Sequence, residues 1–265
     1  MTFLKKPGLI LSALIVLLAL LAVALPALLS PQDPFASIAR EKLLPPSPQH
    51  WFGTDHLGRD LYARVIYGAR LSLAAAAVAV VIGVLVGALV GAVSGAIGGA
   101  LDFVLMRIVD VLVAVPGILL ALIVVASLGF GPWSMALGVG LGAAGSFARV
   151  MRAQVLKVRQ EEYVEAATVM GIRRPVVLLQ HVLPNAARPV ISMAALELGT
   201  AILSVSALSF LGFGAQPPEP EWGSLVAAGR DYVATSLWLS LLPGVCVVIV
   251  VLAVNRLARQ LGADR

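Results

Sequence analysis

The sequence predicts an all-α integral membrane protein, a single transmembrane domain over residues 1–265 with about six spans. Hydrophobic residues make up 60% of the chain and charged residues only 12%, and the mean hydropathy is +0.97. This composition is too apolar for a soluble globular protein. Apolar runs of about 20 residues, the length that crosses a bilayer core, recur along the chain. Polar segments separate them.

The first apolar run, about 9–29, follows a short basic start. These features, together with Ala22-Val-Ala24, also fit a cleaved signal peptide. However, the run is longer than a typical signal core, and its removal would leave an odd number of spans. We therefore expect a retained transmembrane helix.

Residues 30–70 form the first predicted outer segment, whose prolines exclude a continuous helix before Gln49. From Gly58 onward, charged and apolar residues interleave in a pattern that predicts an amphipathic interfacial helix. His50 and His56 have no cysteines or clustered carboxylates beside them in the sequence. We expect ordinary loop residues there and predict no metal site.

The second predicted span, 71–97, carries a glycine at every fourth position: Gly83, Gly87, Gly91 and Gly95. Such a ridge lets another helix approach closely. That helix belongs either to a partner or to this chain.

The third and fourth spans are predicted at 103–126 and 134–150. Arg107 and Asp110 are three residues apart, so we expect them to pair. Pro116 interrupts the third span and allows a bend. The bent helix either lines a translocation path or is a static kink.

A polar, basic island follows, 151–188. Residues 160–170 are good helix formers with acidic residues in the first turn, and Gly171 stands where a left-handed cap is expected. Pro175 suits the first turn of a second short helix, and Pro184 discourages its continuation. Ala166 and Ala167 would keep the exposed face shallow.

The fifth and sixth spans are predicted at 189–211 and 238–254, with a second outer segment, 212–237, between them. That segment is rich in glycine and proline and predicts an ordered re-entrant or surface hairpin. Glu197 is the only acidic residue well inside an apolar stretch. It either faces a translocation path, where it would meet a substrate amine, or is a protonated or hydrogen-bonded carboxyl between helices.

The basic residues predict the orientation, because they are enriched on the cytoplasmic side of membrane proteins. Six are expected outside: Arg40, Lys42, Arg59, Arg64, Arg70 and Arg230. Thirteen are expected in the cytoplasm, with the island and both termini: Lys5, Lys6, Arg107, Arg149, Arg152, Lys157, Arg159, Arg173, Arg174, Arg188, Arg256, Arg259 and Arg265.

No catalytic pattern is present. The chain has no Gly-Lys pair, which a phosphate-binding loop requires, and no helical H-E-x-x-H. A secondary transporter driven by an ion gradient would need an inverted repeat and paired ionisable residues within its spans, and neither is seen. The sequence therefore predicts a pathway that receives its energy from elsewhere, not an enzyme.

The island resembles the E-A-A loop of the membrane subunits of ABC importers. The matching residues are Glu165, Ala166, Ala167, Gly171, Leu183 and Pro184. His181 departs from the pattern, which usually has isoleucine there. The segments HWFGTDHLGRDLYARVIYGARLSL, MRIVDVLVAVPGILLAL and QPPEPEWG resemble the second permease subunit of dipeptide, oligopeptide and nickel importers. The alternative for the island is an amphipathic helix that lies on the lipid interface.

The resemblance implies a type I ABC importer permease fold in the bacterial inner membrane, with the island as a cytoplasmic coupling loop. It further implies a heterodimer with a sister permease, one or two ATPase subunits that hold ATP and Mg²⁺, and an extracytoplasmic substrate-binding protein. No cofactor on this chain and no nucleic-acid partner are expected. Peptides are the expected substrates and nickel is the alternative. Pro116 and Glu197 are expected to line the path. The residues expected to dock the ATPase are Glu161, Glu162, Glu165, Ala166, Ala167, Gly171, Arg173, Arg174, Leu183 and Pro184.

Overall fold

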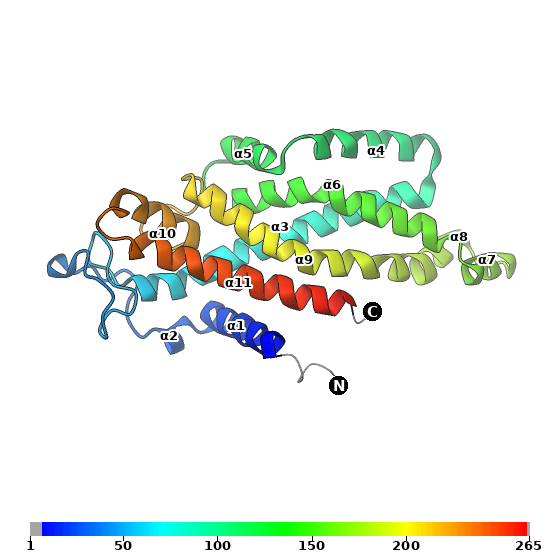
Figure 1. Ribbon diagram of the computed structural model, residues 1–265. Helices are drawn as coiled ribbons and strands as arrows, with labels where there is room; N and C mark the ends of the chain where they lie inside the picture. The colour runs from blue at the N-terminus through cyan, green and yellow to red at the C-terminus, as the bar shows by residue number, and fades with distance from the viewer. Residues whose placement is uncertain (1–6, 264–265) are drawn as a thin grey trace.

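The computed structural model describes residues 7–263, which fold almost entirely into helices (Figure 1). The α-helices are α1 (Pro7–Ala24), α2 (Pro26–Leu29), α3 (Leu61–Ile97), α4 (Gly99–Ala114), α5 (Gly117–Leu128), α6 (Pro132–Val158), α7 (Glu162–Val169), α8 (Arg174–Val177), α9 (Leu183–Phe210), α10 (Trp222–Gly229) and α11 (Trp238–Ala263). Short 3-10 turns lie at Ala39–Glu41 and Arg230–Tyr232. Lys5, Lys6 and Arg265, which the sequence assigns to the cytoplasm, lie outside the described residues.

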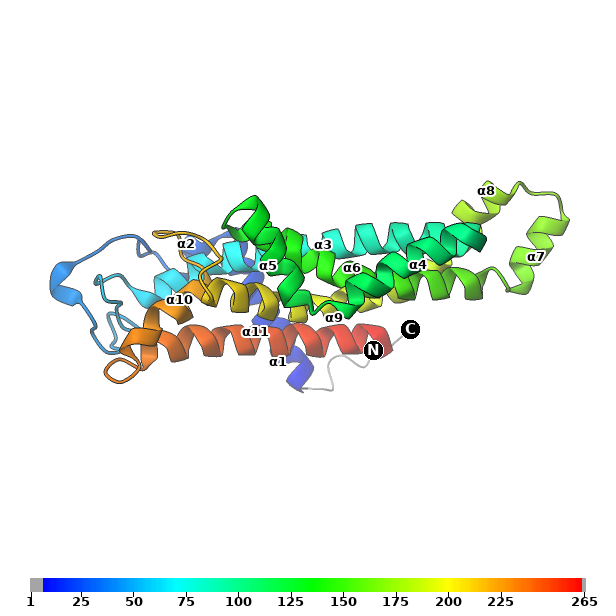
Figure 2. The same cartoon turned by 90° about the horizontal axis from the view of Figure 1, so that it is seen from above.

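The long helices α3, α6, α9 and α11 run along the length of the molecule (Figures 1 and 2). The segment 30–60 and α10 gather at one end, which we call the cap end. Helices α7 and α8 protrude at the opposite end, the loop end. The start of α1 and the end of α11 lie near each other and both point toward the loop end.

Five helices are long and apolar enough to cross a membrane, and the pair α4 and α5 makes a sixth candidate if it is counted as one span. Several helices are longer than the predicted spans. Helix α3 begins at Leu61, α6 continues to Val158, and α11 runs to Ala263. The expected spans followed the apolar runs, whereas the helices continue through polar residues beyond them.

The third span is broken rather than gently bent. Helices α4 and α5 meet at an angle of 93° around Val115 and Pro116. The expected ion pair between Arg107 and Asp110 is wrong. Asp110 instead accepts a hydrogen bond from Arg149 of α6 at 2.9 Å, and the Arg107 guanidinium lies over the Phe103 ring, 5.2 Å from its centroid. Asp110 thus fastens α4 to a neighbouring helix instead of pairing along its own.

The glycine ridge of α3 packs against α6 of the same chain, which decides between the two alternatives left open above. A Cβ atom at Gly83 would lie 3.1 Å from the Gly140 carbonyl oxygen, and one at Gly95 would lie 3.0 Å from the Val155 Cβ. At Gly87 it would lie 2.6 Å from the Phe147 Cβ. Such spacing leaves no room for a side chain, so α3 and α6 are in backbone contact along much of their length.

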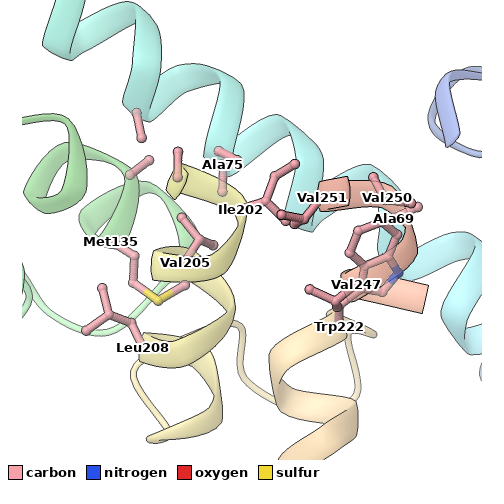
Figure 3. Packing of buried hydrophobic residues seen from close by; sticks show 14 of the residues in the cluster. Ala69, Ala75, Met135, Ile202, Val205, Leu208, Trp222, Val247, Val250 and Val251 are labelled. Atoms are coloured by element: carbon pink, nitrogen blue, oxygen red, sulfur yellow. The ribbon is translucent and has the colours of Figure 1, made fainter. Parts of the chain in front are cut away.

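The core near the cap end contains side chains from α3, α6, α9, α10 and α11, which point toward one another (Figure 3). Trp222 is 3% exposed, and its indole N–H donates to the Val65 carbonyl oxygen at 2.9 Å. Its backbone N–H donates to the Ser72 hydroxyl at 3.0 Å. The second outer segment is therefore drawn inward by α10 and is not a surface hairpin.

The first outer segment also differs from its prediction. Leu61 and Arg64 are 2% and 4% exposed, so the start of α3 is buried in the cap end instead of lying on the interface. Arg64 donates to the carbonyl oxygens of Pro34 at 3.0 Å and Pro218 at 3.3 Å, and thereby joins the two outer segments. The Asp60 side chain caps α3 by accepting from the Ala63 N–H.

Both histidines of this segment have structural contacts. The Nδ1 atom of His50 lies 2.8 Å from an Asp60 carboxylate oxygen, and its Nε2 atom lies 3.6 Å from Glu41. The His56 ring stacks on Tyr232 with the ring centroids 5.7 Å apart. These contacts hold the cap end together.

A buried carboxyl in the cap end makes stability depend on pH. Glu221 is 0% exposed, and burial raises the pKa of its carboxyl, although the Ala215 N–H, which donates to it at 2.9 Å, lowers that pKa in part. The folded state therefore binds more protons than the unfolded state above the ordinary glutamate pKa of about 4.3, and stability falls as pH rises through that window.

We expect Glu221→Gln to remove this loss of stability, because the amide resembles the protonated acid. The wild type should match the variant in melting temperature at acidic pH and fall below it at pH values above the raised pKa. Thermal denaturation of both proteins in one detergent across this range checks the prediction. Parallel curves for the two proteins would contradict it.

Candidate coupling loop and translocation cavity

The coupling loop spans residues 159–182 in the structure, shorter than the predicted 151–188 because α6 and α9 extend into that range. Helix α7 ends at Val169, and Gly171 follows two residues later with a φ of +82°, the left-handed conformation that glycine adopts most easily. The Ile172 N–H donates to the Ala167 carbonyl oxygen across this corner at 3.2 Å. Pro175 lies in the first turn of α8. The predicted helix, glycine corner and second helix are all present.

The inner face of the loop is anchored in a hydrophobic cluster. Val164, Ala167, Val177 and Val182 are each no more than 5% exposed and pack with residues of α6 and α9. Ala167 therefore belongs to the buried face, and its expected place on the outer face is wrong. Ala166, one position earlier on the helix, is exposed. Neighbouring helix residues point about 100° apart, so only one of the two alanines lies on the outer face.

The outer face of the loop combines carboxylates with an apolar tip. Val169 and Met170 are 81% and 74% exposed, and they lie just before the glycine corner. Exposed polar residues surround this tip. None of them takes part in an ion pair among the described residues. They are Glu161, Glu162, Glu165, Arg173 and Arg174.

This tip was not among the residues predicted from the sequence. Val169 and Met170 look in the sequence like ordinary helix residues before a C-terminal cap. Helical periodicity could have indicated it. If Val164 and Ala167 lie on the buried face of the helix, Val169 and Met170 lie away from that face and are exposed.

The end of the loop differs from the prediction, because Pro184 does not stop the helix. The chain continues from α8 through a π-helical segment, Leu178–Val182, directly into α9. Pro184 falls in the first turn of α9, where its missing N–H is tolerated. Pro184 is exposed and Leu183 is half-buried. The loop is thus continuous with a membrane-spanning helix.

Two polar contacts fix the loop on the ends of the neighbouring helices. The Arg159 guanidinium donates to the carbonyl oxygens of Gly95 at 2.7 Å and Ala96 at 3.0 Å, at the C-terminal end of α3. Such a cation satisfies carbonyl groups that lack helical partners. Asn185 of α9 lies 3.2 Å from the Tyr163 hydroxyl of α7. The loop is therefore connected to α3, α6 and α9.

A cavity of about 330 Å³ lies between α5, α6 and α9. Glu197, Thr200 and Ser204 line it from α9, and their spacing places them on one helix face. Ser146 contributes a further hydroxyl from α6.

Of the two residues expected to line a path, Glu197 lies in the wall of this cavity and Pro116 does not. Gly117, which directly follows Pro116, lies in its wall, so the break between α4 and α5 opens beside Glu197. Pro116 itself is exposed. The structure thus places Glu197 and the start of α5 around one cavity. Helix α5 lies on the opposite side of the bundle from α1 (Figure 1).

A bundle of membrane-spanning helices with an anchored loop at one end and a polar cavity between its helices is the architecture of a membrane transporter subunit. The family model described as "Binding-protein-dependent transport system inner membrane component" matches residues 79–264. The chain belongs to this family, and it is a multi-pass inner membrane permease subunit.

Two relatives show how the rest of the chain compares. The chain is 37% identical over 253 residues to the dipeptide transport system permease protein DppC of Alkalihalophilus pseudofirmus. This alignment covers 95% of this chain and 83% of that protein. It is 45% identical over 212 residues to the glutathione transport system permease protein GsiD of Shigella flexneri. This alignment covers 80% of this chain and 70% of that protein. The family expected from the sequence is confirmed.

The fold is confirmed by a solved structure. The MetNI methionine ABC transporter in its inward facing conformations aligns with a TM-score of 0.62 at 20% identity and covers 75% of this chain and 94% of that chain. The predicted fold class, an all-α permease of the ABC importer type, is therefore correct.

Proposed function

We propose that this chain is the permease subunit of an ATP-driven ABC importer and forms one half of a translocation pathway for dipeptides or oligopeptides. The observation that carries the proposal is the coupling loop, which is anchored from behind and presents an apolar tip with carboxylates. The relatives named for dipeptide and glutathione transport support peptides as the substrate class.

The partner at the loop is an ATPase subunit, which holds ATP and Mg²⁺. Val169 and Met170 supply an apolar anchor of the kind that fills a groove in a partner. Glu165 and its neighbouring carboxylates supply acceptors for a partner's arginine. An amphipathic helix on the lipid interface explains the loop less well. The apolar face of such a helix would lie on lipid, whereas the buried face of this loop packs on α6 and α9.

The loop transmits movement because it cannot shift independently of the spans. Its buried valines join α6 and α9, and α9 continues from the loop to the wall of the Glu197 cavity. When ATP closes the ATPase pair, the loop moves with the groove that holds it. The angle of α9 then changes at the cavity. Coupling follows because the ATPase binds the two conformations of the permease with different affinity.

The remaining partners occupy the other surfaces. A sister permease faces the open side of the cavity and completes the pathway. A substrate-binding protein docks on the cap end outside the membrane. The coupling loop and both termini lie in the cytoplasm. This orientation agrees with the charge count and with the start of α1 and the end of α11, which both point toward the loop end.

Nickel is less well supported as a substrate. Both histidines of the first outer segment have partners within the cap end, His50 with carboxylates and His56 with an aromatic ring. The relatives described above are named for dipeptide and glutathione transport.

Co-purification in mild detergent tests the proposal. We expect the chain to retain a sister permease and ATPase subunits, and the reconstituted complex with its binding protein to take up a labelled dipeptide only when ATP is supplied. A complex without an ATPase, or uptake driven by a proton or sodium gradient, would overturn the proposal in favour of a secondary transporter.

A further inference from the structure

We propose that Glu197 binds the ammonium group of the transported substrate. This inference rests on the proposed function and adds to it a ligand and a chemical class. It follows from what surrounds the Glu197 side chain inside the cavity between α5, α6 and α9.

Glu197 is a carboxylic acid with no cationic partner among residues 7–263. It is half-buried, and it takes part in no ion pair or hydrogen bond among the residues that the structure describes. The side chains that line the cavity include no arginine, lysine or histidine. By contrast, the carboxylates of Asp102 and Asp110 on α4 each have an arginine partner on α6. The membrane helices of this chain therefore pair their other carboxylates and leave Glu197 open to the cavity.

The neighbouring groups suit an ammonium group better than they suit an anion. An ammonium group has three N–H donors and no acceptor. Glu197 supplies a charged acceptor, and the hydroxyl oxygens of Thr200 and Ser204 on the same helix face supply neutral ones. A peptide amino terminus is largely protonated at neutral pH, because its pKa is about 7.7 to 8.0.

The dimensions of the cavity also fit a small peptide. Its volume of about 330 Å³ is at the lower end of the range of about 300 to 1,000 Å³ that is typical of small-molecule sites. Its other walls are apolar or small, with Val139, Met193 and Leu208 among them. Such walls accept varied side chains while one charged contact fixes the end that every peptide shares.

A cation from the sister permease is the competing partner for Glu197. The two possibilities differ in what they predict. A subunit contact makes Glu197 necessary for assembly of the complex, whereas a substrate contact makes it necessary for discrimination between peptides with free and blocked amino termini.

The test uses the complete complex without its binding protein, so that only the permease recognises the peptide. Cys246 is replaced by serine, and Ser146→Cys places a reporter thiol on the α6 wall of the cavity. The rate of maleimide labelling of this chain is measured with alanyl-alanine and with N-acetyl-alanyl-alanine.

We expect alanyl-alanine to protect the thiol at about 10- to 100-fold lower concentration than the acetylated peptide, the ratio that loss of a charge-assisted hydrogen bond produces. Glu197→Gln should abolish the difference and Glu197→Asp should keep it. Asp110→Asn, which removes a carboxylate elsewhere in the membrane region, is the matched control and should also keep it.

Equal protection by the two peptides, an unchanged preference in Glu197→Gln, or no protection up to the solubility limit would overturn the proposal. So would loss of the sister permease from the Glu197→Gln complex, which would assign the carboxylate to a subunit contact. ATP-driven uptake by the unmodified complex is measured separately. That measurement tests the proposed function independently of the role of Glu197.

Discussion

Replacing Val169 and Met170 together with aspartate is expected to remove the ATPase subunits from the purified complex. Both side chains lie at the tip of the coupling loop and are among the most exposed apolar groups of the chain. Buried apolar anchors at an interface each contribute about 2 kcal/mol or more, so loss of both should weaken ATPase binding by roughly 1,000-fold. Peptide uptake should fall with it.

The helical content and melting temperature of the permease should not change, because neither side chain belongs to the buried cluster. The matched control is Leu179→Asp, which places a charge on another exposed residue of the same loop, away from the tip. It should reduce ATPase retention much less. Full retention of the ATPase by the double variant would show that the tip is not the docking surface.

Gly87→Val is expected to prevent α3 and α6 from packing, with loss of the folded protein from the membrane. The added Cβ would lie 2.6 Å from the Phe147 Cβ and 3.0 Å from the Ala148 nitrogen. Overpacking of this kind costs about 1 to 3 kcal/mol, and backbone atoms cannot move aside as a flexible side chain can.

Leu89→Val is the control for this variant, since Leu89 is on the same helix and 66% exposed. It should accumulate normally. The measurement is the amount of monodisperse protein extracted from the membrane, together with its melting temperature. Normal yield and stability of Gly87→Val would mean that α3 and α6 are farther apart than the structure shows.

The sequence predicted those features that depend on local chemistry. Glycine adopts a left-handed conformation more easily than other residues, and proline is favoured in the first turn of a helix. Gly171 and Pro175 therefore predicted the shape of the coupling loop. The apolar runs likewise gave the number of candidate spans. In each case the signal lies within a few neighbouring residues.

The features that the sequence missed depend on residues far apart in the chain. Asp110 had a nearby arginine at helical spacing, and only the fold shows that Arg149 of α6 is better placed. The glycine ridge of α3 indicated that another helix packs closely on it, but it did not indicate which helix. Pro184 was predicted to end a helix, because nothing in the sequence marks the π-helical segment that leads directly into α9 and places Pro184 in its first turn.

The backbone contact between α3 and α6 makes these two helices one rigid body from the cap end to the loop end. Arg64 and Trp222 hold this body to the cap, and Arg159 holds it to the coupling loop. A partner that shifts the body at one end therefore shifts it at the other. In the proposed complex, an ATPase binds the loop and a binding protein binds the cap. By thermodynamic reciprocity, the factor by which that ATPase changes the affinity of the cap for the binding protein then equals the factor by which the binding protein changes the affinity of the loop for the ATPase.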